Sequence, residues 1–427
     1  MSFEQGLSGL EASNQNLSVI GNNVANASTV GFKQSETLFA DVYANSLSGG
    51  GSNQVGIGVQ VNSVEQQFTQ GNITTSANPL DIAINGNGFY EMSDNGTLSY
   101  TRNGQFQLDK NGNIVNANGD VLQGYAVNAA GVLETGSTTS LQINTANIPP
   151  NATTTVSPSL NLDSQDSIPT TTPFSISDPS TYNYSSSVTI YDSLGDSHAL
   201  QLYYVKANTT GGASGNEATW DVYASLDNTE VSGTTPPTPI GSLVFNSSGQ
   251  IDTAATSPTI VLQGLAVTTG ATTPLGSNLA AGGITINFTG STQYGATDAT
   301  NGIPQDGYTS GQLSSFSASA NGTIVGSYTN GQSATLGQIA LANFTDPNGL
   351  QNLGNNEWAA TATSGAALVG QPGSGSLGVL QSSATEDSNV DLTSQLVNMI
   401  TAQEDYQANA QTIKTEDDLL QTLVTLR

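Results

Sequence analysis

The chain carries one histidine, His198, so a catalytic triad of serine, histidine and aspartate would have to be built on that residue. Ser197 and Ala199 flank it, beside a turn-forming segment at 192–196. A lone histidine beside a turn is more often structural than catalytic, and no second imidazole is present to act as a general acid or base. We therefore expect a structural role for His198.

Two short patterns resemble ligand-binding motifs. Residues 373–378 read Gly-Ser-Gly-Ser-Leu-Gly and match the G-x-G-x-x-G pattern. Dinucleotide binding also needs a preceding strand and an immediate helix in a βαβ unit, which the sequence does not indicate, so we predict a linker toward the last helix. Residues 109–113 resemble the start of a calcium loop, but glycine stands at the fourth position instead of the sixth, and Asp120 replaces the closing Glu. A hairpin turn is the better interpretation.

Adjacent carboxylates near the C-terminal end offer the remaining candidate chemistry. Glu404/Asp405 and Asp417/Asp418 are pairs of the kind used in acid–base catalysis. On a helix, however, such pairs usually form a solvated face, and no pocket that would shift a pKa is evident. We predict that the protein is not an enzyme and has no catalytic residue, cofactor or metal site.

The strongest pattern is a pair of helical seams in which residues step alternately by four and three, one seam at each end of the chain. Such a seam lies along one side of a helix and is suited to a partner helix. The first seam is Phe3, Leu7, Leu10, Asn14, Leu17, Gly21 and Val24. The second is Leu392, Leu396, Met399, Gln403, Tyr406, Ala410, Ile413, Asp417, Leu420 and Val424. We predict that the two terminal helices pair and that their seams carry self-assembly.

The same seams would also fit a helical hairpin that closes a single globular domain. Asn14, Gly21 and Gln403 favour assembly, because polar or small seam residues fix register and close approach at a cost in stability. The candidate assembly interface therefore consists of the seams, without Asp417, together with Asn22, Asn23 and Asn26.

Capping signals place the starts of both helices. Ser2 with Gln5 forms a capping-box pattern, and the helix should run to about Asn26. Ser388 with Asp391 forms a second one, and that helix could continue to Arg427.

Composition excludes several classes of function. Six basic residues stand against 33 acidic ones, a formal net charge of -27, so the chain lacks the basic patch that nucleic acid or an anionic membrane surface would require. No apolar run is long enough to insert in a membrane, and the start of the chain lacks the features of a cleaved signal peptide. There is no Cys, so disulfides and thiolate chemistry are excluded.

The middle of the chain is dominated by strand and turn signals. Asn-Gly pairs at 95–96, 103–104, 111–112 and 118–119 predict hairpin turns. Further strands are predicted at 55–61, around 187–205 as a hairpin, at 220–223 and at 338–344. Glycine-rich segments at 49–52 and 373–378 are candidate pivots.

The predicted fold class is α+β, mainly β, with paired terminal helices in a coiled-coil inner domain and two outer β domains inserted between them. The expected divisions are an N-terminal helix at 1–33, a connector at 34–75, an inner β domain in two parts at 76–145 and 301–378, an outer β domain at 146–300, and a C-terminal helix at 379–427.

Several stretches resemble the bacterial flagellar rod and hook proteins, a family of axial subunits. The segments are 8–13, 19–26 and 29–33 near the start, and 388–392, 397–400 and 406–415 near the end, in the same order as in the family. Residues 80–84, 101–106 and 341–344 are also similar. The segment 188–198, followed by 202–205, is similar to hook subunits, whereas distal rod proteins are shorter and lack a large outer domain.

The resemblance implies a subunit that polymerises into a curved hollow tube, the hook, and transmits torque as a universal joint between rod and filament. It implies extracellular assembly at the flagellar basal body after export without a cleaved signal. The implied partners are further copies of the chain in a helical homopolymer, the distal rod protein, the hook–filament junction protein, the hook cap and the flagellar type III export apparatus. Two alternatives remain at this point: a distal rod protein, and a non-flagellar, acidic, secreted β-rich protein.

Overall fold

The computed structural model describes residues 2–42, 56–128, 131–208, 218–232, 234–263 and 283–425. The chain divides into two compact units, which we name by their place in the chain. The terminal unit contains residues 1–145, 314–327 and 333–427, and the central unit contains residues 146–313 and 328–332. Each unit is described by itself below.

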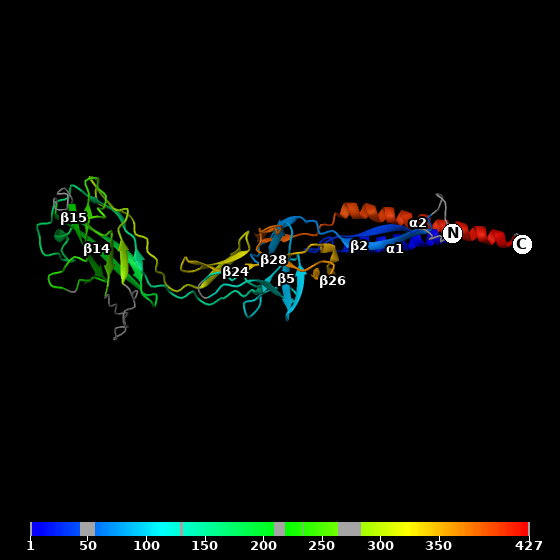
Figure 1. The fold of residues 1–427 in the computed structure, drawn as a ribbon, viewed down its shortest axis with the longest axis horizontal. Helices are drawn as coiled ribbons and strands as arrows, with labels where there is room; N and C mark the ends of the chain where they lie inside the picture. Colours follow the sequence, from blue (N-terminus) through cyan, green and yellow to red (C-terminus); the bar gives the residue numbers. More distant parts are fainter. Residues whose placement is uncertain are drawn as a thin grey trace. The chain divides into compact units, whose positions relative to one another are not determined.

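The terminal unit holds both helices, α1 (Ser2–Ala25) and α2 (Leu392–Thr425), which lie side by side, blue and red in Figure 1. The start of α2 differs from the prediction. Asp391, not Ser388, is the cap, because its carboxylate accepts hydrogen bonds from the N–H groups of Thr393 and Ser394. The side chain of Ser2, in the other predicted capping box, lies outside the described part of the chain.

The predicted connector is a β-hairpin rather than a loop with one strand. Strand β1 (Ser35–Val42) pairs antiparallel with β2 (Gly58–Gln66), with a bulge between Leu38 and Phe39. Both strands pack against α1. The first predicted pivot, 49–52, lies outside the described residues.

The rest of the terminal unit is built from a thirteen-stranded sheet and two small pairs of strands. The main path of the sheet is β22 (Leu313–Ala318), β23 (Thr323–Tyr328), β24 (Ser333–Ile339), β9 (Val121–Tyr125), β5 (Phe89–Asp94), β6 (Thr97–Thr101), β27 (Glu357–Ala359) and β26 (Gln351–Gly354). Its side branches are β7 (Gln107–Leu108), β8 (Ile114–Val115), β10 (Thr139–Ser140), β25 (Leu341–Asn343) and β28 (Leu368–Gly370). The two pairs are β3 (Ile73–Thr75) with β30 (Ala384–Glu386), and β4 (Ile82–Asn85) with β29 (Val379–Ser382).

Three of the four predicted Asn-Gly hairpin turns are present. Residues 95–96 join β5 to β6 with both residues at positive φ, while the pairs at 111–112 and 118–119 lie between β7, β8 and β9. The prediction at 103–104 was wrong. Gly104 has no room for a side chain, because a Cβ there would collide with the carbonyl oxygen of Ile82, whose own N–H donates to the carbonyl of Gly104 over 2.8 Å.

The glycine-rich segment 373–378 is not the predicted linker to the last helix. It forms a closed loop between β28 and β29 in which the N–H of Gly373 donates to the carbonyl of Gly378 over 2.8 Å. The N–H of Gly378 in turn donates to the carbonyl of Asn87 over 2.7 Å. β28 before the loop and β29 after it are each paired with another strand, so the loop is held at both ends.

An aromatic cluster forms the core of this sheet. Phe89 and Phe68 make edge-to-face contacts with Trp358, and Phe344 packs edge-on against Phe89 and Tyr100. Trp358 is 1 % exposed and donates its indole N–H to the Gln66 side chain over 2.6 Å, which fastens the end of β2 to the sheet.

The central unit has three sheets around its own core. The first sheet has the order β11 (Thr155–Val156), β19 (Ile284–Asn287) and β18 (Thr259–Leu262), and the second has the order β20 (Thr292–Tyr294), β12 (Ser159–Asp163) and β21 (Ala299–Gly302). The third has the order β13 (Tyr184–Tyr191), β14 (Ser197–Asn208), β15 (Ala218–Leu226) and β16 (Thr229–Glu230), and β17 (Gly241–Phe245) also pairs with β15. The core includes Ile190, Leu202, Tyr204, Trp220, Phe245, Ile286 and Phe288. The hairpin predicted at 187–205 and the strand at 220–223 are confirmed as β13–β14 and part of β15.

His198 is buried in the central unit between two aspartates. Its Nδ1 lies 2.7 Å from Oδ2 of Asp227, while its Nε2 lies 3.8 Å from Oδ2 of buried Asp192 and has no hydrogen-bond partner among the described residues. The arrangement ties the start of β14 to the turn after β15. Among the described residues, no serine or threonine hydroxyl is hydrogen-bonded to the His198 ring.

Candidate assembly site

The face of α1 that is buried within the chain is a stripe of small and polar residues together with Ile20. It includes Gly6, Gly9, Ser13, Ile20 and Asn23, which keep the alternating spacing of a heptad but precede the predicted seam by one position. One position corresponds to a rotation of about 100° around the helix axis. The packed face within the chain therefore differs from the seam inferred from large apolar residues.

Small residues on this stripe allow close approach to α2. A Cβ placed on Gly6 would lie 3.0 Å from Cγ1 of Ile413, and one on Gly9 would lie 2.7 Å from Oδ1 of Asn409. On α2, Ala402 is buried, while Met399, Ala410 and Ile413 are half-buried. The two helices thus meet along a contact to which α1 contributes glycines.

Most of the predicted interface residues lie on the outer side of this pair. The exposed ones are Phe3, Leu7, Asn14, Asn22, Leu392, Leu396, Gln403, Tyr406, Leu420 and Val424. The half-buried ones are Leu10, Leu17, Gly21, Val24, Asn26, Met399, Ala410 and Ile413.

Further apolar side chains of α2, not among the predicted ones, are also exposed. Val397 and Ile400 are each 58 % exposed, and Leu419 is 55 % exposed. Together with Leu392, Leu396, Tyr406, Leu420 and Val424, which lie on several sides of the helix, they make up what we call the α2 apolar surface. A soluble monomer rarely leaves so many large apolar side chains in water on one element, so this surface indicates an interface.

Asn23 is the one predicted interface residue that is buried, and its side chain is used within the chain. Its Oδ1 accepts from the N–H of Ser35 over 2.9 Å, and its Nδ2 donates to the carbonyl of Ser35 over 2.8 Å and to Gln395 Oε1 over 3.4 Å. Gln395 also donates to the side chain of Gln34. Asn23 therefore joins the end of α1 to β1 and to the first turns of α2.

A group of three buried charges fixes the same junction. Glu386 at the end of β30 accepts from Lys33 Nζ over 2.7 Å through Oε1, and from Arg102 Nε and Nη2 over 3.0 and 2.9 Å through Oε2. The N–H of Gly71 donates to Oε1 of Glu386 over 2.9 Å. We call Lys33, Arg102 and Glu386 the charge triad; all three are at most 2 % exposed.

Backbone carbonyls accept further hydrogen bonds from the two cations. Lys33 donates to the carbonyl of Thr69 over 2.7 Å, and Arg102 Nη1 donates to the carbonyls of Gly86 and Gly88 over 3.0 and 2.9 Å. Burial, and next the repulsion by the Arg102 guanidinium, lower the pKa of Lys33 from its usual value, while Glu386 opposes that shift. One carboxylate thus holds two buried cations and joins segments that are far apart in the sequence.

The sequence analysis did not find the charge triad, although a signal was present. The chain has only six basic residues, and Lys33 and Arg102 both fall in segments that resemble the flagellar family. A scarce cation within such a segment of an acidic chain points to a buried pair rather than to a solubilising surface charge.

Burial of cations leaves the surface strongly acidic. A third basic residue, Lys206 of the central unit, is 2 % exposed, donates to the carbonyls of Ser164 and Asp166, and lies over the Trp220 ring. Of the basic residues that the structure describes, only Lys110 and Lys414 are exposed. Exposed surfaces of two copies will therefore repel each other unless salt screens them.

Within the described ranges, no group of three or more histidine or acidic side chains could hold a metal ion. The calcium-like segment at 109–113 is a hairpin turn in which the Asp109 carboxylate accepts the N–H groups of Asn111 and Asn113 over 2.8 Å. Neither α1 nor α2, as far as they are described, is long and apolar enough to cross a membrane.

Four protein-family models match successive parts of the chain. They are the flagella basal body rod protein at residues 3–33, the flagellar hook protein FlgE/F/G D1 domain at 83–170, the flagellar basal body protein FlaE D2 domain at 161–308, and the flagellar basal body rod FlgEFG protein C-terminal region at 381–426. The matched segments at the two ends contain α1 and α2.

Full-length relatives agree with these matches. The chain is 43 % identical over 432 residues to the flagellar hook protein FlgE of Salmonella typhimurium and 42 % identical over 442 residues to that of Escherichia coli, with all of each chain covered. It is 32 % identical to the FlgE of Borreliella burgdorferi, covering 100 % of this chain and 99 % of that protein.

A solved structure supports the fold. The crystal structure of Helicobacter pylori flagellar hook protein FlgE2 matches with a TM-score of 0.50 at 15 % identity, covering 72 % of this chain and 99 % of that one. At that identity the match bears on the fold alone, a mainly β structure with a helix near each end. The identity of the long relatives, over their whole length, establishes that the chain belongs to the flagellar hook protein FlgE family.

Proposed function

We propose that the chain is the structural subunit of a bacterial flagellar hook, in which many copies form a curved hollow tube that transmits torque from rod to filament. The observation that carries the proposal is the α2 apolar surface, which lies on the element that matches the family's C-terminal region. Covering this surface by further copies would remove the apolar side chains from water.

In this proposal the paired ends of the chain form the inner layer of the tube and the central unit forms an outer layer. The inner assembly domain comprises α1 and α2, with 34–75 as the connector, and the residues 76–145, 314–327 and 333–391 of the terminal unit form an inner β domain. The exposed seam residues of α1 and α2 contact neighbouring copies as a helical coiled-coil layer, while Asn23 acts within the chain.

The proposed partners follow from the place of a hook in the flagellum. They are the distal rod protein at the base, the hook–filament junction protein at the tip, the hook cap during growth, and the type III export apparatus that would deliver the chain without a cleaved signal peptide. The sequence matches that cover the whole length of two named hook proteins support these proposed partners.

The test uses Leu396→Asp on α2. Leu396 is 50 % exposed, so the substitution should leave the folded monomer intact and place a charge in the proposed subunit interface. A buried unpaired charge costs several kcal/mol, on the order of 3–5, which is enough to prevent polymer growth. Electron microscopy of the purified chain at high concentration and salt measures the outcome.

The matched control is Leu194→Asp, which changes an equally exposed leucine in a turn of the central unit. Curved tubes from the wild type and the control, with none from Leu396→Asp, are the expected result. Curved tubes from Leu396→Asp would exclude the α2 apolar surface as the assembly site. Straight, rigid tubes from the wild type would instead favour a distal rod protein, and monomers alone a secreted protein of another kind.

A further inference from the structure

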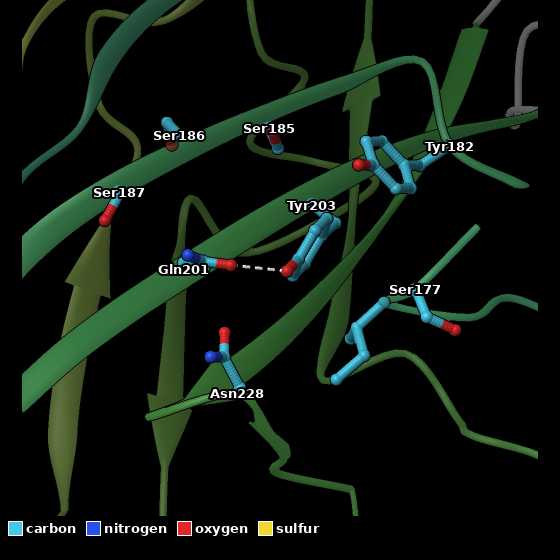
Figure 2. A pocket seen from close by; sticks show the side chains of 9 residues that line it. Ser177, Tyr182, Ser185, Ser186, Ser187, Gln201, Tyr203 and Asn228 are labelled. Atoms are coloured by element: carbon cyan, nitrogen blue, oxygen red, sulfur yellow. Dashed lines mark hydrogen bonds between the residues drawn. The ribbon is translucent and has the colours of Figure 1, made fainter. Parts of the chain in front are cut away.

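The central unit contains a cavity of about 420 Å³, and the described residues that line it all have uncharged side chains. It lies on the face of strands β13 and β14 opposite the core, where segment 176–182 and the turn after β15 form its sides. Figure 2 shows Ser187, Gln201 and Asn228 along one side of the space and Tyr182 and Ser177 along the other. The volume is in the range that is usual for small-molecule sites.

Several side-chain donors and acceptors that line this cavity have no hydrogen-bond partner among the described residues. The Tyr203 hydroxyl donates to Oε1 of Gln201 over 2.5 Å, so the N–H groups of the Gln201 amide stay available. Within the described chain, the side chains of Ser185, Ser187 and Asn228 have no hydrogen-bond partner. Two hydroxyls and two amides can therefore each donate and accept toward one ligand.

Aromatic rings supply the apolar part of the site. Tyr182 packs edge-on against Tyr203 with ring centroids 4.9 Å apart, and Phe174 lies against both. Phe174 also stacks on Tyr223 at 4.1 Å, so the four rings form one cluster. Tyr182 is half-buried, so part of its ring is free to pack on the C–H face of a ligand.

The charges around the cavity exclude ionic ligands. Among the described residues, no cationic side chain lines the cavity to pair with a phosphate or carboxylate, and no acidic one lines it to pair with an amine. The two aspartates next to lining residues in the sequence have other partners: Asp178 accepts from Ser180, and Asp227 accepts from His198 and Ala199. In an acidic chain, an uncharged cavity with mixed hydroxyl, amide and aromatic lining fits a neutral polyhydroxylated molecule.

We propose that this cavity binds a neutral saccharide, with Tyr182 against the sugar ring and Gln201, Asn228, Ser185 and Ser187 bonded to its hydroxyls. This site is separate from the hook function proposed above, because none of its residues belongs to α1 or α2. The sugar can be free or part of a polymeric glycan, and the two share the same recognition chemistry.

The test is ligand-observed saturation-transfer NMR on the full chain with glucose, galactose, N-acetylglucosamine and maltose, together with retention on immobilised dextran and amylose. The variants are Gln201→Leu, which removes the amide, and Tyr182→Leu, which removes the ring. The controls are Gln165→Leu and Tyr294→Leu, exposed residues of the same unit away from the cavity. Fluorescence of buried Trp220 checks that each variant is folded.

At least one saccharide should bind to the wild type and to both controls, and about tenfold more weakly to each cavity variant. Binding of free sugars alone would assign a free saccharide, and retention on a polysaccharide as well would assign a polymeric glycan. Absence of binding by every saccharide, or equal affinity in the cavity variants and wild type, would overturn the proposal. So would a cavity variant whose only effect is on self-association, since the occupant would then be another copy.

Discussion

At the scale of single residues, the charge triad is the most consequential feature of the terminal unit. Glu386 is the only anion in contact with Lys33 and Arg102 among the described residues, and all three side chains are shielded from water. Such a group is a poor source of net stability compared with an apolar core, but removal of one member leaves uncompensated charge. Its value lies in specifying which segments must meet.

We expect Glu386→Gln to destabilise the terminal unit by about 3–5 kcal/mol, because two buried cations would then face each other without a counter-charge. Urea unfolding followed by Trp358 fluorescence, in a Trp220→Phe background, reports on this unit alone. Glu404→Gln, an exposed change on α2, should shift the free energy of unfolding by less than about 0.5 kcal/mol. Equal stabilities for the two variants would show that the triad is not required.

Asp298 in the central unit provides a prediction about pH. Burial, and then the nearby Asp166 carboxylate, raise the pKa of Asp298 to about 6, although the N–H of Asp163 donates to it over 2.7 Å. The folded state therefore binds more protons than the unfolded state between about pH 4 and pH 6, and the free energy of unfolding falls as pH rises through that window. Partial exposure keeps the effect modest.

Asp298→Asn should remove this part of the pH dependence, since an amide can still accept from Asp163 but does not ionise. The measurement is the unfolding midpoint of the central unit from pH 4 to pH 8, followed by Trp220 fluorescence in a Trp358→Phe background. The variant should be relatively more stable than wild type above pH 6 and lose the difference near pH 4. A parallel pH profile in both proteins would contradict the assignment.

At the scale of elements, the two sides of α1 serve different contacts. Gly6 and Gly9 bring α1 close to α2, whereas Phe3 and Leu7 on the predicted seam stay exposed. Helical periodicity is recognised from large apolar side chains, so the seam was predicted and the stripe that contains Gly6 and Gly9 was missed. Glycine has no side chain, so a helix contact built on glycines adds nothing to the apolar pattern of the sequence.

Glycine substitutions on α1 should separate these two contacts. Gly9→Val should weaken the pairing with α2, because even its Cβ would lie within 2.8 Å of the Asn409 side chain. Gly21→Ala, with nothing within 4 Å of the added Cβ, should instead stabilise the helix by up to about 1 kcal/mol. Circular dichroism during thermal unfolding measures both. A loss of helix stability in Gly21→Ala equal to that in Gly9→Val would contradict this division.

The sequence predicted the elements whose signals are local and missed those decided by distant contacts. Both helices, the β13–β14 hairpin and three Asn-Gly turns follow from periodicity and turn chemistry. Strand β1 was missed because its alternation is weak and its partner β2 lies beyond an intervening segment. The loop at 373–378 and Gly104 were misread because Gly378 and Gly104 pack closely against the backbone carbonyls of Asn85 and Ile82.

At the scale of the whole molecule, the terminal unit is completed by the last part of the chain. β29 pairs with β4, β30 pairs with β3, and Glu386 fills the gap between Lys33 and Arg102. The central unit uses none of these residues and has its own core. A chain that has not yet supplied residue 386 can therefore complete the central unit but not the terminal one.

Two truncated chains test this dependence, one ending at residue 378 and one ending at residue 391. The longer chain lacks α2 but keeps β29, β30 and the charge triad, so Trp358 should stay buried with a native emission spectrum. The shorter chain lacks all three, so its Lys33 and Arg102 would be unpaired and Trp358 should be exposed to quenching.

Trp220 should keep its native emission in both truncated chains, because the central unit is intact in each. Single-tryptophan backgrounds allow the two signals to be measured separately. Native emission from Trp358 in the chain ending at 378 would show that the terminal unit closes without Glu386. Loss of the Trp358 signal in both chains, with Trp220 native, would instead place the decisive contact on α2, and the contact between α2 and α1 would then outweigh the triad.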